Sequence, residues 1–261
     1  MKAWIITIGN EILIGRVVNT NSAWLAKKLT TMGIEVRKMI TIPDEEDEII
    51  HTFREAVNHA DLVISTGGLG PTFDDKTSEA LAKALNRRWV INPDAYEEVK
   101  KKFEEADMEL TEAWFKMAKM PEGSISLSNS AGTAPGILLE INGKLIVALP
   151  GVPREMKAIF EESLEKILAE KAPHKHFAEK SIGVLGIPES AFAPYIDEIM
   201  KKYPKIYIKS HPRGHETKGP VLEIHITTYA ETQRDAIKLV EYAAKEIIKK
   251  IDDLGGEVTY Q

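Results

Sequence analysis

The chain has no cysteine among its 261 residues. Disulfide bonds, thiolate metal sites and redox control by thiols are therefore excluded, and a reducing compartment is allowed. Long apolar runs are also lacking, because the N-terminal run over residues 3–8 is far too short to span a bilayer and precedes no small-residue cleavage site. We therefore expect a soluble, cytoplasmic protein with no membrane partner.

Several catalytic signatures are missing as well. The sequence has neither a G-x-x-x-x-G-K-S/T P-loop nor a nucleophile elbow, so NTPase and α/β-hydrolase functions lose their usual anchors. Its most glycine-rich segment, residues 67–70, does not follow the first strand and does not match the dinucleotide-binding fingerprint. A net charge of −6 gives no sequence-wide attraction to nucleic acid, which makes it an unlikely partner.

Apolar runs that predict buried strands alternate with helical patterns over the first 170 residues. This βαβαβ order predicts an α/β domain with a mostly parallel sheet and right-handed crossovers. Asn142-Gly143 separates two further apolar runs and predicts a hairpin within that sheet. A helix over 154–170, entered through Pro153, closes the predicted domain, residues 1–170.

A second, smaller α+β domain is predicted for residues 178–253. The polar stretch 171–176 separates it from the first domain. Its pattern reads strand, helix, strand, strand, helix, a βαββα order typical of a two-layer module.

Two glycine-containing segments, residues 65–77 and 149–155, each follow a predicted strand and lead into a predicted helix. Glycine allows a positive φ and a close approach of the backbone to a ligand, and the start of a helix offers unpaired N–H groups. The pair predicts a phosphate-binding edge of the sheet. Tight turns between strand and helix need glycine anyway, so a purely structural role stays open.

Carboxylates next to the first of these segments favour a functional role. Asp74 and Asp75 would repel a phosphate unless a cation lay between them and it, although one of the two could cap the next helix. Thr77 could add a hydroxyl ligand, and Glu11, just past the first strand, is expected to face the same crevice. Thr20 and Asn21 could be cap residues or ligand contacts, and the small-residue loop 128–136 could be coil or a sugar or phosphate contact.

Read in order, segments 9–13, 19–21, 66–72, 75–77, 131–136 and 149–153 resemble the CinA family and, more widely, the molybdopterin-binding domain of MoaB/Mog-type proteins. Asn10 stands where many relatives have Asp. The resemblance implies a three-layer α/β domain that binds a phosphorylated, nucleotide-like or pterin ligand. The residues it implies as ligand contacts are Gly9, Glu11, Asn21, Thr66, Gly67, Gly68, Gly70, Thr72, Gly132, Thr133, Pro150 and Gly151.

Residues 178–253 resemble the small KH-type module that follows this domain in longer CinA proteins, but they lack a Gly-x-x-Gly RNA clamp. The further amidohydrolase domain of those proteins is not in the sequence, so its activity is not expected. CinA proteins associate as dimers, and the alternating apolar residues Leu222, Ile224 and Ile226 offer a sheet face or edge for packing. We therefore expect a homodimer.

The resemblance leads to two functional hypotheses. The first is a metal-dependent pyrophosphatase that splits ADP-ribose, or a similar nucleotide diphosphate, into AMP and a sugar phosphate. In it, Asp75 and Thr77 are catalytic, and Asp75, with Asp74 or Glu11, holds a divalent cation such as Mg²⁺, Mn²⁺ or Co²⁺. The alternative is a molybdopterin-binding or adenylyl-transfer protein of molybdenum cofactor biosynthesis that uses the same loops. A nucleotide sensor without turnover is a weaker third reading.

Overall fold

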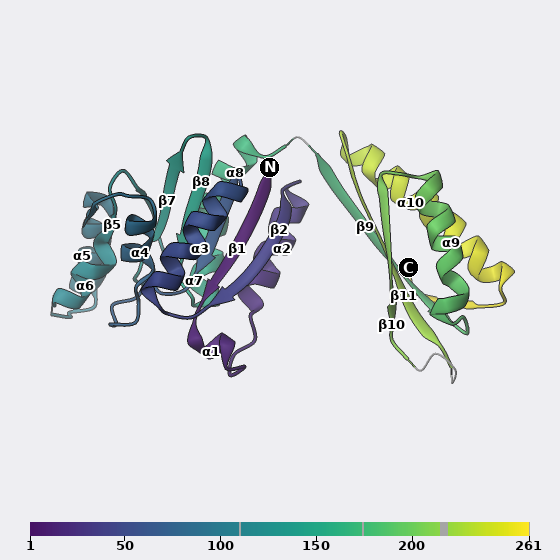
Figure 1. Cartoon of the computed structure of the whole chain (residues 1–261), viewed down its shortest axis with the longest axis horizontal. Helices are drawn as coiled ribbons and strands as arrows, with labels where there is room; N and C mark the ends of the chain where they lie inside the picture. Colours follow the sequence, from purple (N-terminus) through teal and green to yellow (C-terminus); the bar gives the residue numbers. More distant parts are fainter. Residues whose placement is uncertain (110, 174, 215–218, 261) are drawn as a thin grey trace. The chain divides into compact units, whose positions relative to one another are not determined.

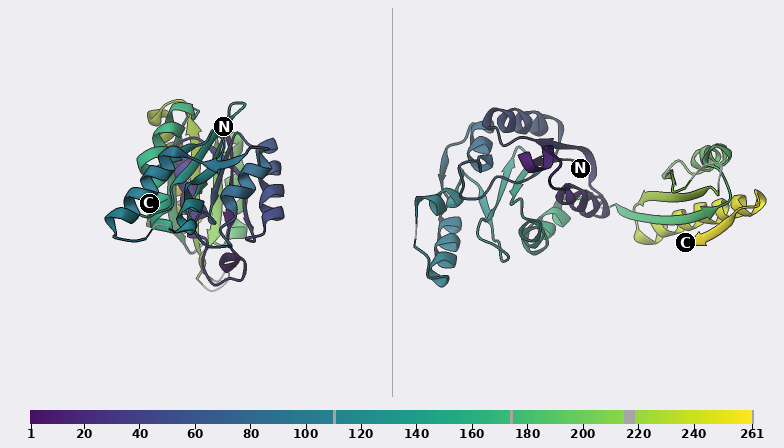
Figure 2. Two further views of the ribbon diagram at one scale, coloured as in Figure 1. Left: turned by 90° about the vertical axis from the view of Figure 1, so that its left-hand side faces the viewer. Right: turned by 90° about the horizontal axis from the view of Figure 1, so that it is seen from below.

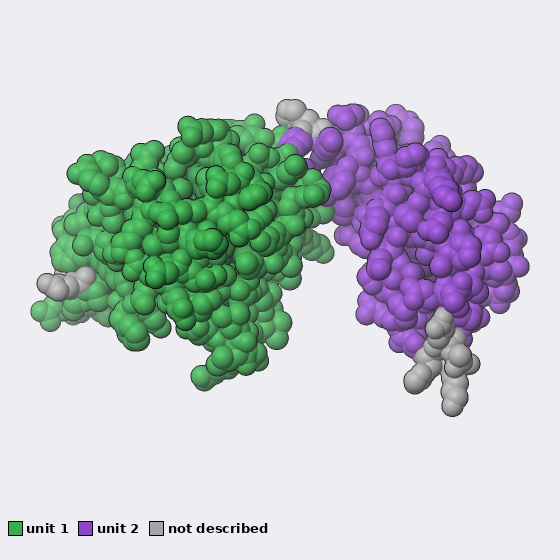
Figure 3. Space-filling model, viewed as in Figure 1, with its two compact units in different colours: residues 1–30, 34–172 green, residues 31–33, 173–261 purple. Residues whose placement is uncertain are grey.

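The computed structural model describes residues 1–109, 111–173, 175–214 and 219–260. The chain forms two compact units, each with its own hydrophobic core (Figure 3). Unit 1 comprises Met1–Thr30 and Ile34–Ala172, and unit 2 comprises Thr31–Gly33 and Pro173–Gln261. The predicted domain boundaries at residues 170 and 178 fall on either side of this division.

The centre of unit 1 is a six-stranded sheet (Figure 1). Its strands are β1 (Lys2–Ile8), β2 (Glu35–Ile42), β3 (Leu62–Thr66), β6 (Ile125–Leu127), β7 (Gly136–Ile141) and β8 (Lys144–Leu149). They lie in the order β2-β1-β3-β8-β7-β6; the first four are parallel to one another, and β7 pairs antiparallel with both β8 and β6. The predicted hairpin is confirmed, because β7 and β8 pair through a turn in which Asn142 and Gly143 have φ of 52° and 76°.

Helices cover both faces of this sheet (Figures 1 and 2). The helices of unit 1 are α1 (Asn10–Leu13), which has no buried residue, α2 (Thr20–Thr31), α3 (Glu46–His59), α4 (Thr77–Ala84), α5 (Pro93–Glu105), α6 (Glu112–Ala118), α7 (Pro153–Ile159), the π-helical turn η1 (Phe160–Leu164) and α8 (Glu165–Lys171). On one face, Phe53 of α3 and Leu81 of α4 share a core with Ile6 of β1. On the other, Trp24 of α2 meets Phe160 edge-on, with ring centroids 5.2 Å apart. The mixed α/β fold with a parallel-rich sheet is confirmed.

Continuous apolar runs explain why the strands of this sheet were predictable. Residues 3–8 of β1 and all of β3 are buried, since helices cover both of their faces. The short strands β4 (Trp89–Ile91), β5 (Lys119–Pro121) and β6 were not predicted, because three residues give too little pattern to recognise. The predicted helix over 154–170 is real but includes the π-helical turn η1.

Unit 2 is a four-stranded antiparallel sheet with two helices. Its elements are β9 (His176–Leu185), α9 (Glu189–Lys202), β10 (Ile206–Pro212), β11 (Val221–Ala230), α10 (Gln233–Asp253) and β12 (Glu257–Tyr260). The strand order is β10-β11-β9-β12, so β12 adds a strand to the predicted βαββα pattern. The KH-type topology remains a prediction.

One argument for a homodimer is wrong. Leu222, Ile224 and Ile226 are at most 2% exposed and belong to the core of unit 2, together with residues of α9 and α10. Their strand, β11, lies between β10 and β9 and is therefore no sheet edge. The alternation reflects packing against the unit's own helices, and self-association itself stays a prediction.

Across the described residues, none of the helices combines the length and the apolar character needed to cross a membrane.

Candidate functional site

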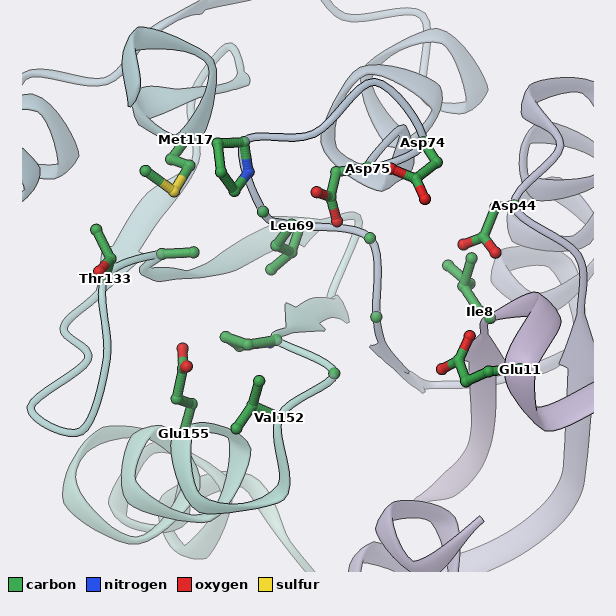
Figure 4. A pocket seen from close by; sticks show the side chains of 18 residues that line it. Ile8, Glu11, Asp44, Leu69, Asp74, Asp75, Met117, Thr133, Val152 and Glu155 are labelled. Atoms are coloured by element: carbon green, nitrogen blue, oxygen red, sulfur yellow. The ribbon is translucent and has the colours of Figure 1, made fainter. Parts of the chain in front are cut away.

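The carboxyl ends of the parallel strands in unit 1 open onto a cavity of about 550 Å³. Figure 4 shows the side chains that line it. Ligands of open α/β sheets bind at this edge, and the volume suits a mononucleotide-sized molecule. The lining residues are Ile8, Gly9, Glu11, Asp44, Gly67, Gly68, Leu69, Gly70, Pro71, Asp74, Asp75, Met117, Thr133, Ala134, Pro150, Gly151, Val152 and Glu155.

The loop after β3 turns at two glycines with positive φ, Gly67 at 109° and Gly68 at 68°. A Cβ on Gly67 would lie 2.1 Å from the carbonyl oxygen of Ile8, and one on Gly68 would lie 2.2 Å from Oγ1 of Thr77. Only glycine fits at such distances, so both positions have a structural role whatever the loop binds.

The same loop presents backbone donors to the cavity. The N–H of Gly67 donates to the carbonyl of Leu149 at 3.0 Å and is therefore engaged. The next three N–H groups, of Gly68, Leu69 and Gly70, donate to no backbone carbonyl within the described part of the chain, and these residues line the cavity. Consecutive unpaired N–H groups are the donors that phosphate-binding loops use.

Thr77 lies beneath this loop and does not line the cavity. It is fully buried, and its hydroxyl donates to the carbonyl of Gly67 at 2.8 Å. Its backbone N–H donates to the carbonyl of Gly68 at 3.1 Å. This arrangement supports a role in holding the loop rather than the predicted role as a hydroxyl ligand of a cation.

Asp74 and Asp75 both line the cavity, and both bond back to Thr72. The backbone N–H of Thr72 donates to Oδ2 of Asp75 at 2.9 Å, and its hydroxyl lies within 2.5 Å of a carboxylate oxygen of each aspartate. The bond from Thr72 lowers the pKa of Asp74 below its usual value. Neither carboxylate caps α4, since Lys76 occupies the cap position without a side-chain bond.

Asp44 joins these aspartates from the end of β2. Its Oδ2 accepts the N–H of Asn10 at 2.8 Å. Burial raises the pKa of Asp44, and the negative charges of Glu11, Asp74 and Asp75 raise it further, while the bond from Asn10 opposes the rise. Four acidic side chains thus line one side of the cavity, Glu11, Asp44, Asp74 and Asp75, and Glu155 lines the opposite side. Among the residues described, the lining contains no lysine or arginine.

The donor set on this side suits a hard divalent cation, because every side-chain ligand it offers is a carboxylate oxygen. Within the described ranges, however, no three His, Cys, Asp or Glu side chains converge closely enough to hold a metal ion. A cation here would take one or two carboxylates and complete its shell with water and ligand phosphates, as Mg²⁺ does in many phosphate sites. Glu11, Asp74 and Asp75, the predicted metal ligands, all face this space (Figure 4).

Asn21 and Thr66 line a separate recess of about 70 Å³, which shares Ile8, Glu11 and Gly151 with the main cavity. The amide Nδ2 of Asn21 donates to the carbonyl of Gly151 at 2.8 Å and to Oγ1 of Thr66 at 3.4 Å. Its Oδ1 is buried and has no partner among the described residues. An unpaired buried acceptor lowers stability, so Oδ1 of Asn21 is a candidate contact for a donor on the ligand.

Loop 128–136 closes the cavity opposite the acidic side chains. Thr133 lines it, whereas Gly132 lies behind Glu155, whose carboxylate carbon would sit 2.1 Å from a Cβ on Gly132. Asn129 is fully buried and donates its Nδ2 to the carbonyl of Ala134 at 2.8 Å and to Oε2 of Glu155 at 2.7 Å.

Most of the predicted site residues are brought together. The structure places ten of them on the main cavity: Gly9, Glu11, Gly67, Gly68, Gly70, Asp74, Asp75, Thr133, Pro150 and Gly151. Asn21 and Thr66 line the adjoining recess, and Thr72, Thr77 and Gly132 stand behind the lining.

Sequence reasoning missed three residues of this site. Asp44, which lies just before α3, was not among the expected site residues, yet it lines the cavity. Its position just after β2, equivalent to that of Glu11 after β1, was the available signal. Asn129 and Glu155 lie in the segments 128–136 and 149–155 that the sequence analysis singled out, but nothing local marked these two side chains, because only the fold brings the two segments together.

Comparisons with known proteins show the family to which the chain belongs. Residues 4–170 match the family model described as a probable molybdopterin binding domain. The chain belongs to this molybdopterin-binding domain family. A protein from Pyrobaculum calidifontis is 51% identical over 95% of both chains, and one from Thermoplasma acidophilum is 44% identical over 98% of both.

Among solved structures, a CinA protein of unknown function from Thermoplasma acidophilum matches with a TM-score of 0.60 and 45% identity. The match covers 64% of this chain and 97% of that one. Unit 1 is thus a CinA-like member of the molybdopterin-binding domain family, as the motifs predicted.

Proposed function

We propose that unit 1 binds a phosphorylated pterin of the molybdopterin type, with a divalent cation between its phosphate and the acidic side chains. The observation that carries this proposal is the juxtaposition of the N–H groups of residues 68–70 with Glu11, Asp44, Asp74 and Asp75. The family to which the chain belongs supports the pterin as the ligand.

The cation follows from charge. Phosphate and carboxylate groups a few ångströms apart repel one another, and the lining as described holds no basic side chain, although the charges of Lys116 and Lys76 nearby help to lower the pKa of Asp74. A divalent cation would bridge both, while the loop N–H groups bind the remaining phosphate oxygens.

The chemistry such a site supports is adenylyl transfer, in which the ligand phosphate attacks the α-phosphorus of ATP and pyrophosphate leaves. A second candidate is hydrolysis of ADP-ribose to AMP and ribose 5-phosphate, which the CinA resemblance suggests. The same acidic group beside a phosphate loop would serve either reaction.

Product analysis separates the two. The protein is incubated with Mg²⁺ and either ADP-ribose or ATP plus molybdopterin, and the nucleotide products are resolved by chromatography. Pyrophosphate and adenylylated pterin from the second mixture alone support transfer, whereas AMP from the first supports hydrolysis. A complete lack of ligand binding with Mg²⁺, Mn²⁺ and Co²⁺ would refute the proposal as a whole.

A further inference from the structure

Glu155 is a carboxylate that the phosphate and cation do not use. It lies in the first turn of α7 and faces the cavity from the side opposite Asp44 and Glu11 (Figure 4). Among the described residues it has no ion-pair partner within 4.0 Å. Its charge is therefore available to a ligand group other than the phosphate.

A buried asparagine fixes the position of this carboxylate. Asn129 is fully buried and donates its Nδ2 to Oε2 of Glu155 at 2.7 Å and to the carbonyl of Ala134 at 2.8 Å. Its own Oδ1 accepts the N–H of Ala131 at 3.1 Å, so a flip of the side-chain amide would break all three bonds. Asn129 thus holds Glu155 by one bond and its own loop by the bonds to Ala134 and Ala131.

The ion pair between Glu98 and Lys102 anchors Asn129 in turn. Its N–H donates to Oε1 of Glu98 at 2.8 Å, and its carbonyl accepts from Nζ of Lys102 at 2.6 Å. Gly132 allows the carboxylate of Glu155 to rest against the loop, since a Cβ there would lie 2.1 Å from its Cδ. The carboxylate is therefore held before any ligand arrives.

The acceptor capacity of Glu155 is mostly unused. A carboxylate has about four lone-pair sites, and the bond from Asn129 occupies one of them. A ligand that presents two adjacent N–H donors could bind both oxygens, as planar donor pairs commonly do with carboxylates.

Between Glu155 and the phosphate loop, the lining is apolar. Leu69 and Met117 are each 7% exposed; in Figure 4, Leu69 lies near the middle of the cavity, Val152 lies beside Glu155, and Met117 lies near Thr133. Apolar and thioether side chains pack well against the face of an aromatic ring. The cavity thus combines a predicted phosphate side, apolar side chains and a fixed carboxylate.

We propose that Glu155 selects the ring of the ligand by accepting two N–H donors from a 2-amino-4-oxopyrimidine edge, the edge shared by pterin and guanine. This inference rests on the proposed function, because it assumes that the phosphate lies at the glycine loop. Adenine presents one acceptor and one donor on the corresponding edge, so it would set a lone pair against the carboxylate. The site therefore discriminates against adenine.

The test uses GMP, IMP and AMP as probes with the full chain and Mg²⁺ in a calorimetric titration. IMP keeps the ring N–H of GMP but lacks its amino group. We expect affinity to decrease from GMP to IMP to AMP, with at least about a tenfold difference between GMP and AMP. Equal affinities for GMP and AMP would overturn the inference without any variant.

The substitution Glu155→Gln keeps the shape and an oxygen for Asn129 but replaces an acceptor with a donor. GMP affinity should fall about tenfold or more, while AMP affinity should hold or rise, because an amide matches the adenine edge. The matched control is Glu161→Gln, because the Glu161 side chain is 51% exposed and its carboxylate pairs with Lys28 at 3.2 Å, outside the residues that line the cavity. Equal losses for GMP and AMP in Glu155→Gln would indicate a structural role only and would overturn the inference.

Inorganic pyrophosphate distinguishes this failure from failure of the proposed function. If pyrophosphate binds with Mg²⁺ but the three nucleotides do not differ, the phosphate side stands and the ring selection by Glu155 is wrong. If pyrophosphate does not bind, the proposed function falls, and the inference falls with it.

Discussion

Replacing Thr77 by Val tests whether this residue holds the glycine loop or serves the ligand. The side chain is fully buried, and its hydroxyl donates to the carbonyl of Gly67 at 2.8 Å. Valine has nearly the same shape, so the change removes one hydrogen bond and leaves the Gly67 carbonyl without that donor. An unsatisfied buried acceptor costs about 1–3 kcal/mol, and we expect the free energy of unfolding to fall by that amount.

The matched control is Thr77→Ser, which keeps the hydroxyl and loses one methyl group, at a cost of about 1 kcal/mol. Urea unfolding followed by tryptophan fluorescence is a suitable assay, because all four tryptophans (Trp4, Trp24, Trp89 and Trp114) lie in unit 1. A Thr77→Val protein that unfolds at the wild-type urea concentration yet no longer binds Mg²⁺-pyrophosphate would refute the structural assignment and restore Thr77 as a ligand residue.

Three further substitutions test the cavity itself. Asp75→Asn removes a charge but keeps an acceptor for Thr72, so Mg²⁺-dependent binding should be lost while the fluorescence-detected unfolding changes by about 1 kcal/mol or less; unchanged binding would leave Asp75 a loop residue. Burial raises the pKa of Asp44, so protons should compete with Mg²⁺ at a pH above the ordinary aspartate value of 3.8, and Asp44→Asn should flatten that pH dependence in a titration from neutral to acid. Because the pKa of Asp44 is higher in the folded than in the unfolded protein, its ionised carboxylate lowers the free energy of unfolding at neutral pH. Asp44→Asn removes this charge and should therefore not lower the stability at neutral pH. A clear loss of stability there would contradict the direction of the pKa shift. Asn21→Ala removes the buried Oδ1 that lacks a partner, and a ligand affinity equal to wild type, measured by calorimetry, would show that no ligand donor reaches it.

Much of the fold was predictable because its signals are local. Buried strands such as β3 are continuous apolar runs, and the β7–β8 hairpin depends on the conformations that Asn142 and Gly143 adopt readily. The three-residue strands and β12 escaped prediction, since so few residues show no period and owe their pairing to distant partners. Leu222 is a different case: the alternation of apolar residues is real, but it was assigned to a dimer contact, whereas the unit's own helices cover that face. A pattern of apolar residues does not say what covers them.

The candidate site also has residues that local signals predicted and residues that depend on contacts between distant segments. Glu11 lies just past β1, and Asp74 and Asp75 lie in the loop between β3 and α4, so the order of strands and helices predicted that all three face one edge of the sheet. Glu155 depends on a bond to Asn129, 26 residues away in the sequence, and no local pattern encodes that contact. Thr77 sits in the motif that the resemblance emphasised, but only its bond to Gly67 reveals what its hydroxyl does.

The central claim is that the acidic cavity of unit 1 binds a phosphorylated ligand through a divalent cation. Calorimetric titration of the protein with inorganic pyrophosphate, first in excess EDTA and then in Mg²⁺, tests it most directly. The account predicts binding in Mg²⁺ that disappears in EDTA and in Asp75→Asn. Equally tight binding in EDTA, or its persistence in Asp75→Asn, would contradict the account.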